Sequence, residues 1–171
     1  IDLPSSTFDA ALCRWGLMFF PNPKAGLSNI YRSLVKGGHF AAAVWASPEK
    51  VPFISVPMNI VLQETHSPPP RTLGPFSMSD QYNLKKLFEE SGFVHIVTER
   101  IKVVSDFDSS DDFAAFTIDH GGPALQKVLA GETNERRQQI EKAISKGSEK
   151  YADSTGKVKF ENEAIVIVGR K

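Results

Sequence analysis

A strand, a helix and a second strand follow one another between Phe8 and Ala46, and this pattern constrains the fold more than any other. Phe8 to Trp15 (FDAALCRW) and His39 to Ala46 (HFAAAVWA) are mostly apolar runs of strand length. Near-continuous apolarity is typical of parallel strands that are covered on both faces. Two such strands joined by a helix form a crossover unit, which is almost always right-handed and parallel. The sequence therefore predicts an α/β protein.

Asn22 and Pro23 predict where the intervening helix begins. Asparagine accepts a hydrogen bond from a free N–H group of the first turn, and proline fits the first helical position. One helix face then carries four apolar residues at helical spacing, namely Leu27, Ile30, Tyr31 and Leu34. We expect Gly37-Gly38 to end this helix.

The region from Pro48 to Pro75 holds most of the eleven prolines. Val51 to Glu64 within it is expected to form a short helix, and the prolines Pro68 to Pro70 after it are expected to be extended. We interpret residues 48–76 and 109–151 as cap or insert segments. Both belong to what we expect to be one truncated domain spanning residues 1–171.

Periodicity and turn signals predict the remaining elements. Ser79 is expected to cap a helix that ends at Gly92. Ser109 or Ser110 is expected to cap a shorter helix, which Gly121-Gly122-Pro123 ends. Glu132 to Tyr151 predicts a charged helix with a narrow apolar stripe. Two further strands are predicted, Val94 to Val104 and Val158 to Val168.

Composition excludes several classes of partner. The chain of 171 residues has 20 Lys+Arg and 20 Asp+Glu, so no field of one sign favours nucleic acid or an anionic membrane surface. A single cysteine, Cys13, rules out an internal disulfide and fits a reducing compartment. No apolar run approaches the roughly 18 residues that a membrane helix needs. We therefore expect a cytoplasmic protein. The four histidines lack metal-ligand spacing, so we expect no metal site.

Three segments in order carry a family resemblance: LPSSTFDAALCRWGLMFF, NPKAGLSNIYRSLVKGGHFAAAVW and FSMSDQYNLKKLFEESGF. Together they resemble class I S-adenosylmethionine-dependent methyltransferases of the ubiquinone/menaquinone-biosynthesis-like, small-molecule type. Phe8-Asp9, Gly37-Gly38 and Gly92-Phe93 match that family in type and spacing. The resemblance implies that the predicted strands are the fourth, fifth and sixth of the family's sheet. A seventh strand would return antiparallel between the fifth and the sixth.

The printed sequence also departs from the family's pattern. It holds no glycine-rich GxGxxG loop, and no counterpart of the acidic residue that binds ribose. We therefore expect the C-terminal portion of a Rossmann-like methyltransferase sheet, with parallel strands, an antiparallel last strand and a helical cap. Such a chain would be inactive alone, as the C-terminal part of a methyltransferase acting on a small, apolar or aromatic acceptor.

The resemblance implies that S-adenosylmethionine lies beyond the carboxyl end of the strand Phe8–Trp15. It then implies that Cys13, Arg14, Trp15 and Gly16 contact the methionine part of this cofactor. No catalytic residue is assigned, because methyl transfer depends mainly on alignment and on the exclusion of water.

An apolar acceptor pocket is expected from aromatic and sulfur-containing side chains, with one histidine as a candidate base for a hydroxyl acceptor. Simpler interpretations stay open: core packing for the aromatic residues, a small buried hydrophobe for Cys13, a salt bridge for Arg14 and a solvated loop position for the histidine, His120. The residues expected at this pocket are Met18, Phe19, Trp45, Phe53, Phe76 and Phe116, with His120 as the base.

An alternative function follows from the expected strand order. In the order fourth, fifth, seventh, sixth, the strand Phe8–Trp15 lies at an edge, and an apolar edge recruits a partner by strand pairing. We therefore expect a homodimer or swapped oligomer with this strand at or near the interface. The chain would then be a non-catalytic binding or assembly module instead of an enzyme part.

Overall fold

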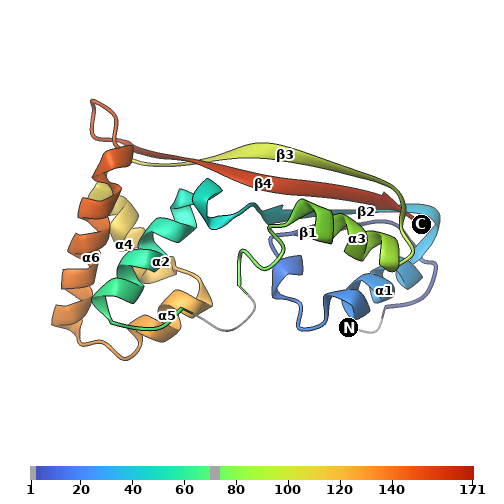
Figure 1. The fold of residues 1–171 in the computed structure, drawn as a ribbon, viewed down its shortest axis with the longest axis horizontal. Coiled ribbons are helices and arrows are strands. Elements are labelled where there is room, and N and C mark those ends of the chain that lie inside the picture. The colour runs from blue at the N-terminus through green and yellow to red at the C-terminus, as the bar shows by residue number, and fades with distance from the viewer. Residues whose placement is uncertain (1–2, 70–73) are drawn as a thin grey trace. The chain divides into compact units, whose positions relative to one another are not determined.

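The computed structural model describes residues 3–69 and 74–171, which form two compact units (Figure 1). The first unit comprises residues 1–47, 73–102 and 163–171, and the second comprises residues 48–72 and 103–162. The second unit thus contains most of both expected cap segments. The expectation of an extended proline run reaches Pro70, which lies outside the described residues.

Four strands form one sheet in the order β1-β2-β4-β3. β1 and β2 are parallel, with Ala11 opposite Phe40, and β2 and β4 are antiparallel, with Ala42 opposite Ile167. The predicted parallel crossover, the antiparallel last strand and the edge position of the first strand are therefore confirmed. The strands are β1 (Phe8–Arg14), β2 (Leu34–Trp45), β3 (Val94–Phe107) and β4 (Val158–Arg170).

The crossover helix α1 (Pro23–Ser33) begins where the sequence predicts, because Asn22 Oδ1 accepts a hydrogen bond of 3.0 Å from the Ala25 N–H. Its end differs from the prediction. The helix stops at Ser33, and Gly37-Gly38 lies inside β2. Gly37 has a φ of +85°, and a Cβ at Gly38 would lie 3.0 Å from the Asp9 carbonyl oxygen. The two glycines therefore allow β1 to approach an irregular part of β2, instead of ending the helix.

Exposure of β1 also differs from the prediction. Leu12 is 84% exposed and Phe8 is 40% exposed, although both were expected to be covered. Leu12 lies opposite Ala41, so it shares the sheet face that points away from buried Phe40. An edge strand has a neighbour on one side only. Within the described residues, β1 is covered mainly on the face of Ala11 and Cys13.

Phenylalanine packing holds helix α3 (Gln81–Glu90) against the first unit's sheet. Phe88 of α3 is fully buried, with ring centroids 5.4 Å from Phe40 of β2 and 5.3 Å from Phe93. The helix begins one residue later than predicted, because Asp80 and not Ser79 caps it. Asp80 Oδ1 accepts a hydrogen bond of 3.0 Å from the Asn83 N–H.

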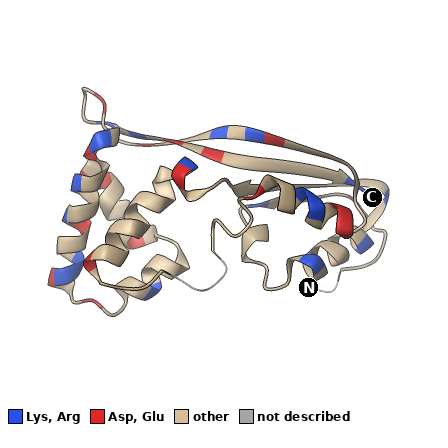
Figure 2. Cartoon of the chain, in the orientation of Figure 1, with Lys and Arg blue, Asp and Glu red and all other residues tan. Residues whose placement is uncertain are grey.

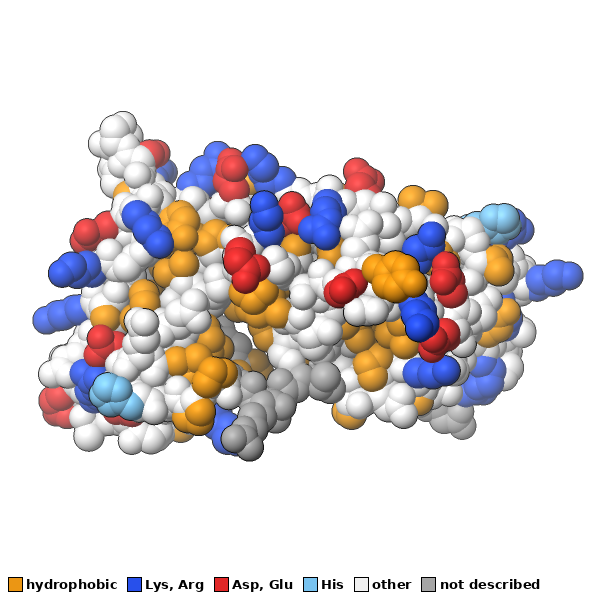
Figure 3. All heavy atoms as spheres, in the orientation of Figure 1, with side chains coloured by type: hydrophobic (Ala, Val, Ile, Leu, Met, Phe, Trp, Pro, Cys, Tyr) orange, Lys and Arg blue, Asp and Glu red, His pale blue; other side chains and the backbone are white. Residues whose placement is uncertain are grey.

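Charged residues of both signs are interspersed on the visible face of each unit, as Figure 2 and Figure 3 show. This mixing is clearest along helix α6 (Asn134–Ser148) of the second unit. The helix is shorter at both ends than the expected Glu132 to Tyr151, and Thr133 caps it. Every helix among the described residues is too short or too polar to span a bilayer.

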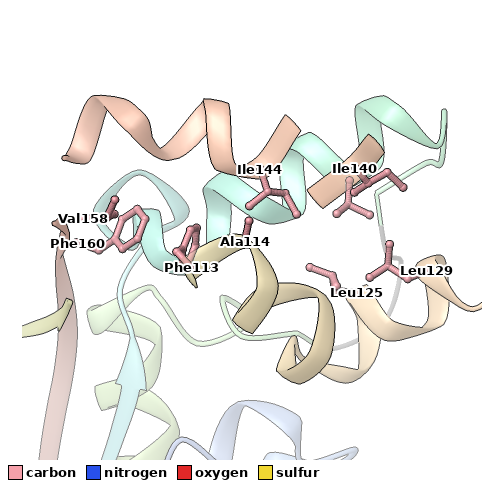
Figure 4. Packing of buried hydrophobic residues seen from close by; sticks show 9 residues of the cluster. Phe113, Ala114, Leu125, Leu129, Ile140, Ile144, Val158 and Phe160 are labelled. Carbon is pink, nitrogen blue, oxygen red and sulfur yellow. The ribbon is translucent and has the colours of Figure 1, made fainter. Parts of the chain in front are cut away.

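Helices of the second unit enclose an apolar core (Figure 4). Two of these helices, α2 (Pro52–Glu64) and α4 (Ser110–His120), follow the sequence prediction, with Ser109 as the cap of α4. Another helix of this unit, α5 (Pro123–Leu129), was not predicted. Gly121-Gly122-Pro123 was interpreted only as the end of α4, although proline also fits the first turn of a new helix. The buried cluster consists of Val61, Phe113, Ala114, Leu125, Leu129, Ile140, Ile144, Val158 and Phe160.

Replacing Phe113 with alanine tests this core. Phe113 is fully buried, with its ring centroid 4.5 Å from that of Phe160. The loss of a buried phenylalanine ring is expected to lower the free energy of unfolding by about 3–5 kcal/mol. Urea denaturation measures the change. Phe116→Ala in the same helix is the control, because Phe116 is 40% exposed. Equal losses for the two variants would contradict the described core.

Candidate functional site

The carboxyl ends of β1 and β2 lie side by side in the first unit. Arg14 pairs with Ala43 in the parallel register, and the Trp15 N–H donates a hydrogen bond of 3.0 Å to the Ala43 carbonyl oxygen. Parallel strands end at the same edge of a sheet, and open α/β sheets bind ligands beyond this edge. The residues that follow β1 and the last residue of β2 therefore form the candidate site.

Two stacked indole rings mark this edge. The ring centroids of Trp15 and Trp45 are 3.9 Å apart, and the ring planes differ by 7°. Trp15 has a φ of +57°, a left-handed conformation that costs roughly 1–2 kcal/mol for a residue with a side chain. Aromatic stacking contributes about 0.5–1.5 kcal/mol beyond area burial. The stack is therefore of the right size to offset most of the backbone strain that places it.

Gly16 follows at a point of close approach. A Cβ at Gly16 would lie 3.0 Å from the Sγ atom of half-buried Cys13. A 3-10 helix, Leu17–Phe19, begins immediately after, and the Phe19 N–H donates to the Gly16 carbonyl oxygen at 3.0 Å. The chain thus turns sharply over the end of its own strand, and Gly16 allows it to do so.

The 3-10 helix is anchored from a distant segment. Ser77 Oγ donates a hydrogen bond of 2.7 Å to the Met18 carbonyl oxygen. Met18 is fully buried, whereas Phe19 is 46% exposed and Phe76 is half-buried. Sequence reasoning missed Ser77, because 59 positions separate it from Met18 and no local pattern links them.

Arg14 is exposed at the end of β1. Within residues 3–69 and 74–171, its guanidinium forms no ion pair, so the predicted alternative of a salt bridge is not observed there. The same described residues hold no group of three or more His, Cys, Asp or Glu side chains that could bind a metal ion.

The expected site residues divide between the two units. The first unit holds all the expected cofactor contacts, together with Met18, Phe19, Trp45 and Phe76, whereas Phe53, Phe116 and His120 belong to the second unit. Phe53 packs among four phenylalanine rings, with centroid distances from 5.9 to 6.3 Å. Phe116 is partly exposed and stacks on exposed His120, with centroids 5.1 Å apart.

A family model described as a methyltransferase domain matches residues 1–42. The matched part contains β1, α1 and β2 as far as Ala42. No curated protein matches the chain.

The fold of this chain is similar to that of a solved structure described as a methyltransferase. A protein of Bacillus halodurans, described as a "putative methyltransferase", is 22% identical with a TM-score of 0.53, over 100% of this chain and 73% of its own. An S-adenosylmethionine-dependent methyltransferase of Thermotoga maritima is 18% identical, with a TM-score of 0.47, over 100% of this chain and 59% of its own. Phosphoethanolamine N-methyltransferase 2 of Haemonchus contortus, in complex with S-adenosyl-L-methionine, is 13% identical. Its TM-score is 0.49, over 99% of this chain and 34% of its own.

The family match confirms the predicted resemblance to methyltransferases over residues 1–42. The similarity to the Bacillus halodurans structure confirms the predicted Rossmann-like fold. The chain spans 73% of the first of these structures and smaller shares of the other two.

A double-mutant cycle tests the indole pair. Trp15→Ala and Trp45→Ala are expected to couple by about 0.5–1.5 kcal/mol in the free energy of unfolding, because each removes the same stacking contact. Alanine retains a Cβ, so the backbone strain at position 15 stays unchanged. Chemical denaturation of the single and double variants measures the coupling. Pairing Trp45→Ala with Tyr82→Ala, at a residue that is 77% exposed, is the control and is expected to show none. Additive effects of the two tryptophan variants would show that the rings do not interact.

Proposed function

We propose that this chain is part of an S-adenosylmethionine-dependent methyltransferase that acts on a small, apolar or aromatic acceptor. The family match over residues 1–42 supports methyl transfer in general. The observation that carries the proposal is the stacked pair Trp15 and Trp45 beside exposed Arg14, at the carboxyl ends of two parallel strands.

The residues at this edge fit the methionine part of the cofactor. Indole faces attract cations, and the cofactor's sulfonium is a cation. Both indoles are half-buried, so each retains accessible surface. The Arg14 guanidinium matches the geometry of the methionine carboxylate, which it can bind through two parallel hydrogen bonds. Cys13 and Gly16 would bring backbone groups close to the same ligand.

The cofactor supplies a methyl group that is activated by its positively charged sulfur. The chain's own residues would align the acceptor and exclude water, which is the main requirement of this chemistry. Exposed Phe19 and half-buried Trp45 and Phe76 are the proposed acceptor wall in the first unit. Met18 is enclosed and would support this wall from behind.

The acceptor uses a lone pair to form the new bond to carbon, and a hydroxyl acceptor must also give up its proton. His120 remains our candidate for the base that takes this proton, and it belongs to the second unit, as do the expected acceptor residues Phe53 and Phe116. His120 is exposed and stacked on Phe116, so its ring is accessible to a substrate.

We further propose that this chain does not complete the cofactor site by itself. The printed sequence contains no glycine-rich loop of the kind that cradles a nucleotide. Residues 1–171 alone are therefore expected to be inactive, and a longer protein that contains them is expected to bind the cofactor.

Calorimetry with S-adenosylmethionine tests both statements. The chain alone is expected to show no binding at micromolar concentration. In the protein encoded by the whole gene, Arg14→Gln is expected to weaken binding about 10- to 100-fold, because a hydrogen bond to a charged group contributes about 1.5–3 kcal/mol. The control is Lys142→Gln, which removes an exposed charge in α6. Micromolar binding by residues 1–171 would refute the proposal that the cofactor site is incomplete. Unchanged cofactor affinity in the Arg14 variant would refute the proposal that Arg14 contacts the cofactor.

A second candidate function rests on the edge position of β1. Its outward side chains Leu12 and Phe8 are exposed, and an edge strand of this kind pairs readily with another chain. We propose as the alternative that the chain is an assembly module, forming a homodimer or swapped oligomer through Phe8–Trp15.

Light scattering after size exclusion tests the alternative. Leu12→Lys is expected to convert the dimer to a monomer, because lysine on an edge strand disfavours pairing. Val97→Lys on β3, at the opposite edge of the sheet, is the matched control, since Val97 is 66% exposed. A monomeric unmodified chain at micromolar concentration would rule this function out.

A further inference from the structure

A basic pocket lies at the amino end of β2, where β3 begins and β4 ends in the first unit. Its volume is about 440 Å³, and Lys36, Gly37, Val94, His95, Arg170 and Lys171 line it. Three lining residues have cationic side chains, and no lining side chain is acidic. Figure 2 shows Lys and Arg residues beside the point marked C. The pocket therefore concentrates positive charge in a chain whose net charge is zero.

The Lys171 ammonium is held by groups of α1 and of the start of β2. Its Nζ donates hydrogen bonds to the carbonyl oxygens of Leu34, at 2.7 Å, and Arg32, at 3.3 Å. The same ammonium lies 5.0 Å from the centroid of the Tyr31 ring. Its backbone pairs with β2, because the Gly37 N–H donates to the Lys171 carbonyl oxygen at 2.9 Å. This ammonium is thus already bonded to protein groups outside the pocket lining, so Lys36 and Arg170 are the cations that remain for a ligand.

Arg170 is placed by the absence of a side chain at Gly37. A Cβ at Gly37 would lie 3.2 Å from Arg170 Nη2, so the guanidinium lies against bare backbone. His95 has a φ of +50°, which is uncommon for a residue with a side chain. The pocket is thus lined by the first residues of β3, the last residues of the chain and Gly37 of β2.

We infer that this pocket binds a phosphate-bearing small molecule. A guanidinium matches phosphate oxygens with two parallel hydrogen bonds, and lysines add point charges. At about 3.3 Å per residue, the stretch of β2 from Lys36 to Trp45 spans roughly 30 Å. One small ligand therefore cannot reach both the pocket and the indole pair, and this inference does not rest on the proposed methyl transfer.

Nuclear magnetic resonance with inorganic pyrophosphate tests the inference on residues 1–171. The titration is expected to saturate, with the largest amide shifts at Gly37, His95 and Lys171. The double variant Lys36→Gln/Arg170→Gln is expected to bind at least tenfold more weakly. The matched control Lys142→Gln/Lys146→Gln removes the same charge from exposed positions of α6 and is expected to bind like the unmodified chain.

Three results would overturn the inference: shifts spread over lysines throughout the chain, a titration that does not saturate, or equal weakening by the two double variants. If the Arg170 substitution impairs folding, Lys36→Gln alone decides the question. Lys36 is exposed, so its replacement is expected to leave the fold intact. Unchanged pyrophosphate affinity in this single variant would then count against the pocket.

Discussion

The parallel pairing of β1 with β2 is the constraint on which the other features of the first unit depend. Helix α1 returns the chain so that both strands point the same way, and the register places Cys13 beside Ala42 and Arg14 beside Ala43. Their carboxyl ends therefore coincide. In an antiparallel hairpin, Arg14 and Trp45 would lie at opposite ends of the strand pair. The two indoles could then not stack, and Arg14 would not lie at the same edge as Trp45.

β2 connects two chemically different ends of the first unit's sheet. Its carboxyl end presents an aromatic edge with one exposed guanidinium, whereas its amino end contributes a lysine and a glycine turn to a basic pocket. Pairing with β4 is antiparallel, and this brings Arg170 to the amino end of β2. The same central strand thus positions a surface suited to a cation with a carboxylate and, separately, a surface suited to an anion.

The second unit has a core of its own, built from apolar residues of α2, α4, α5 and α6 and of the first part of β4. The two expected cap segments, 48–76 and 109–151, supply all four of these helices, and β3 and β4 contribute residues to both units. Among the expected acceptor residues, Phe53 packs within this aromatic group, while Phe116 and His120 reach its surface. The packed ring of Phe53 is therefore less accessible to a ligand than the exposed rings of Phe116 and His120.

The sequence by itself determined the four strands, every longer helix except α5, and the parallel crossover. These follow from short-range signals: apolar runs of strand length, the cap at Asn22 and the proline after it. Gly37-Gly38 was misread as a helix end, because two glycines signal a stop and a strand irregularity equally well. Only the approach of the Asp9 carbonyl oxygen distinguishes them. Ser79 and Asp80 are likewise both good caps, and the prediction of Ser79 was wrong by one residue.

Tertiary structure alone decided which of these residues meet. The left-handed turn at Trp15, the hydrogen bond from Ser77 to Met18, the exposure of Leu12 and the pocket around Arg170 all join positions far apart in the chain, or depend on what covers a strand. Periodicity reports only the neighbours that a residue has along its own helix or strand. Contacts between elements depend on register and on close approach, which no local pattern encodes.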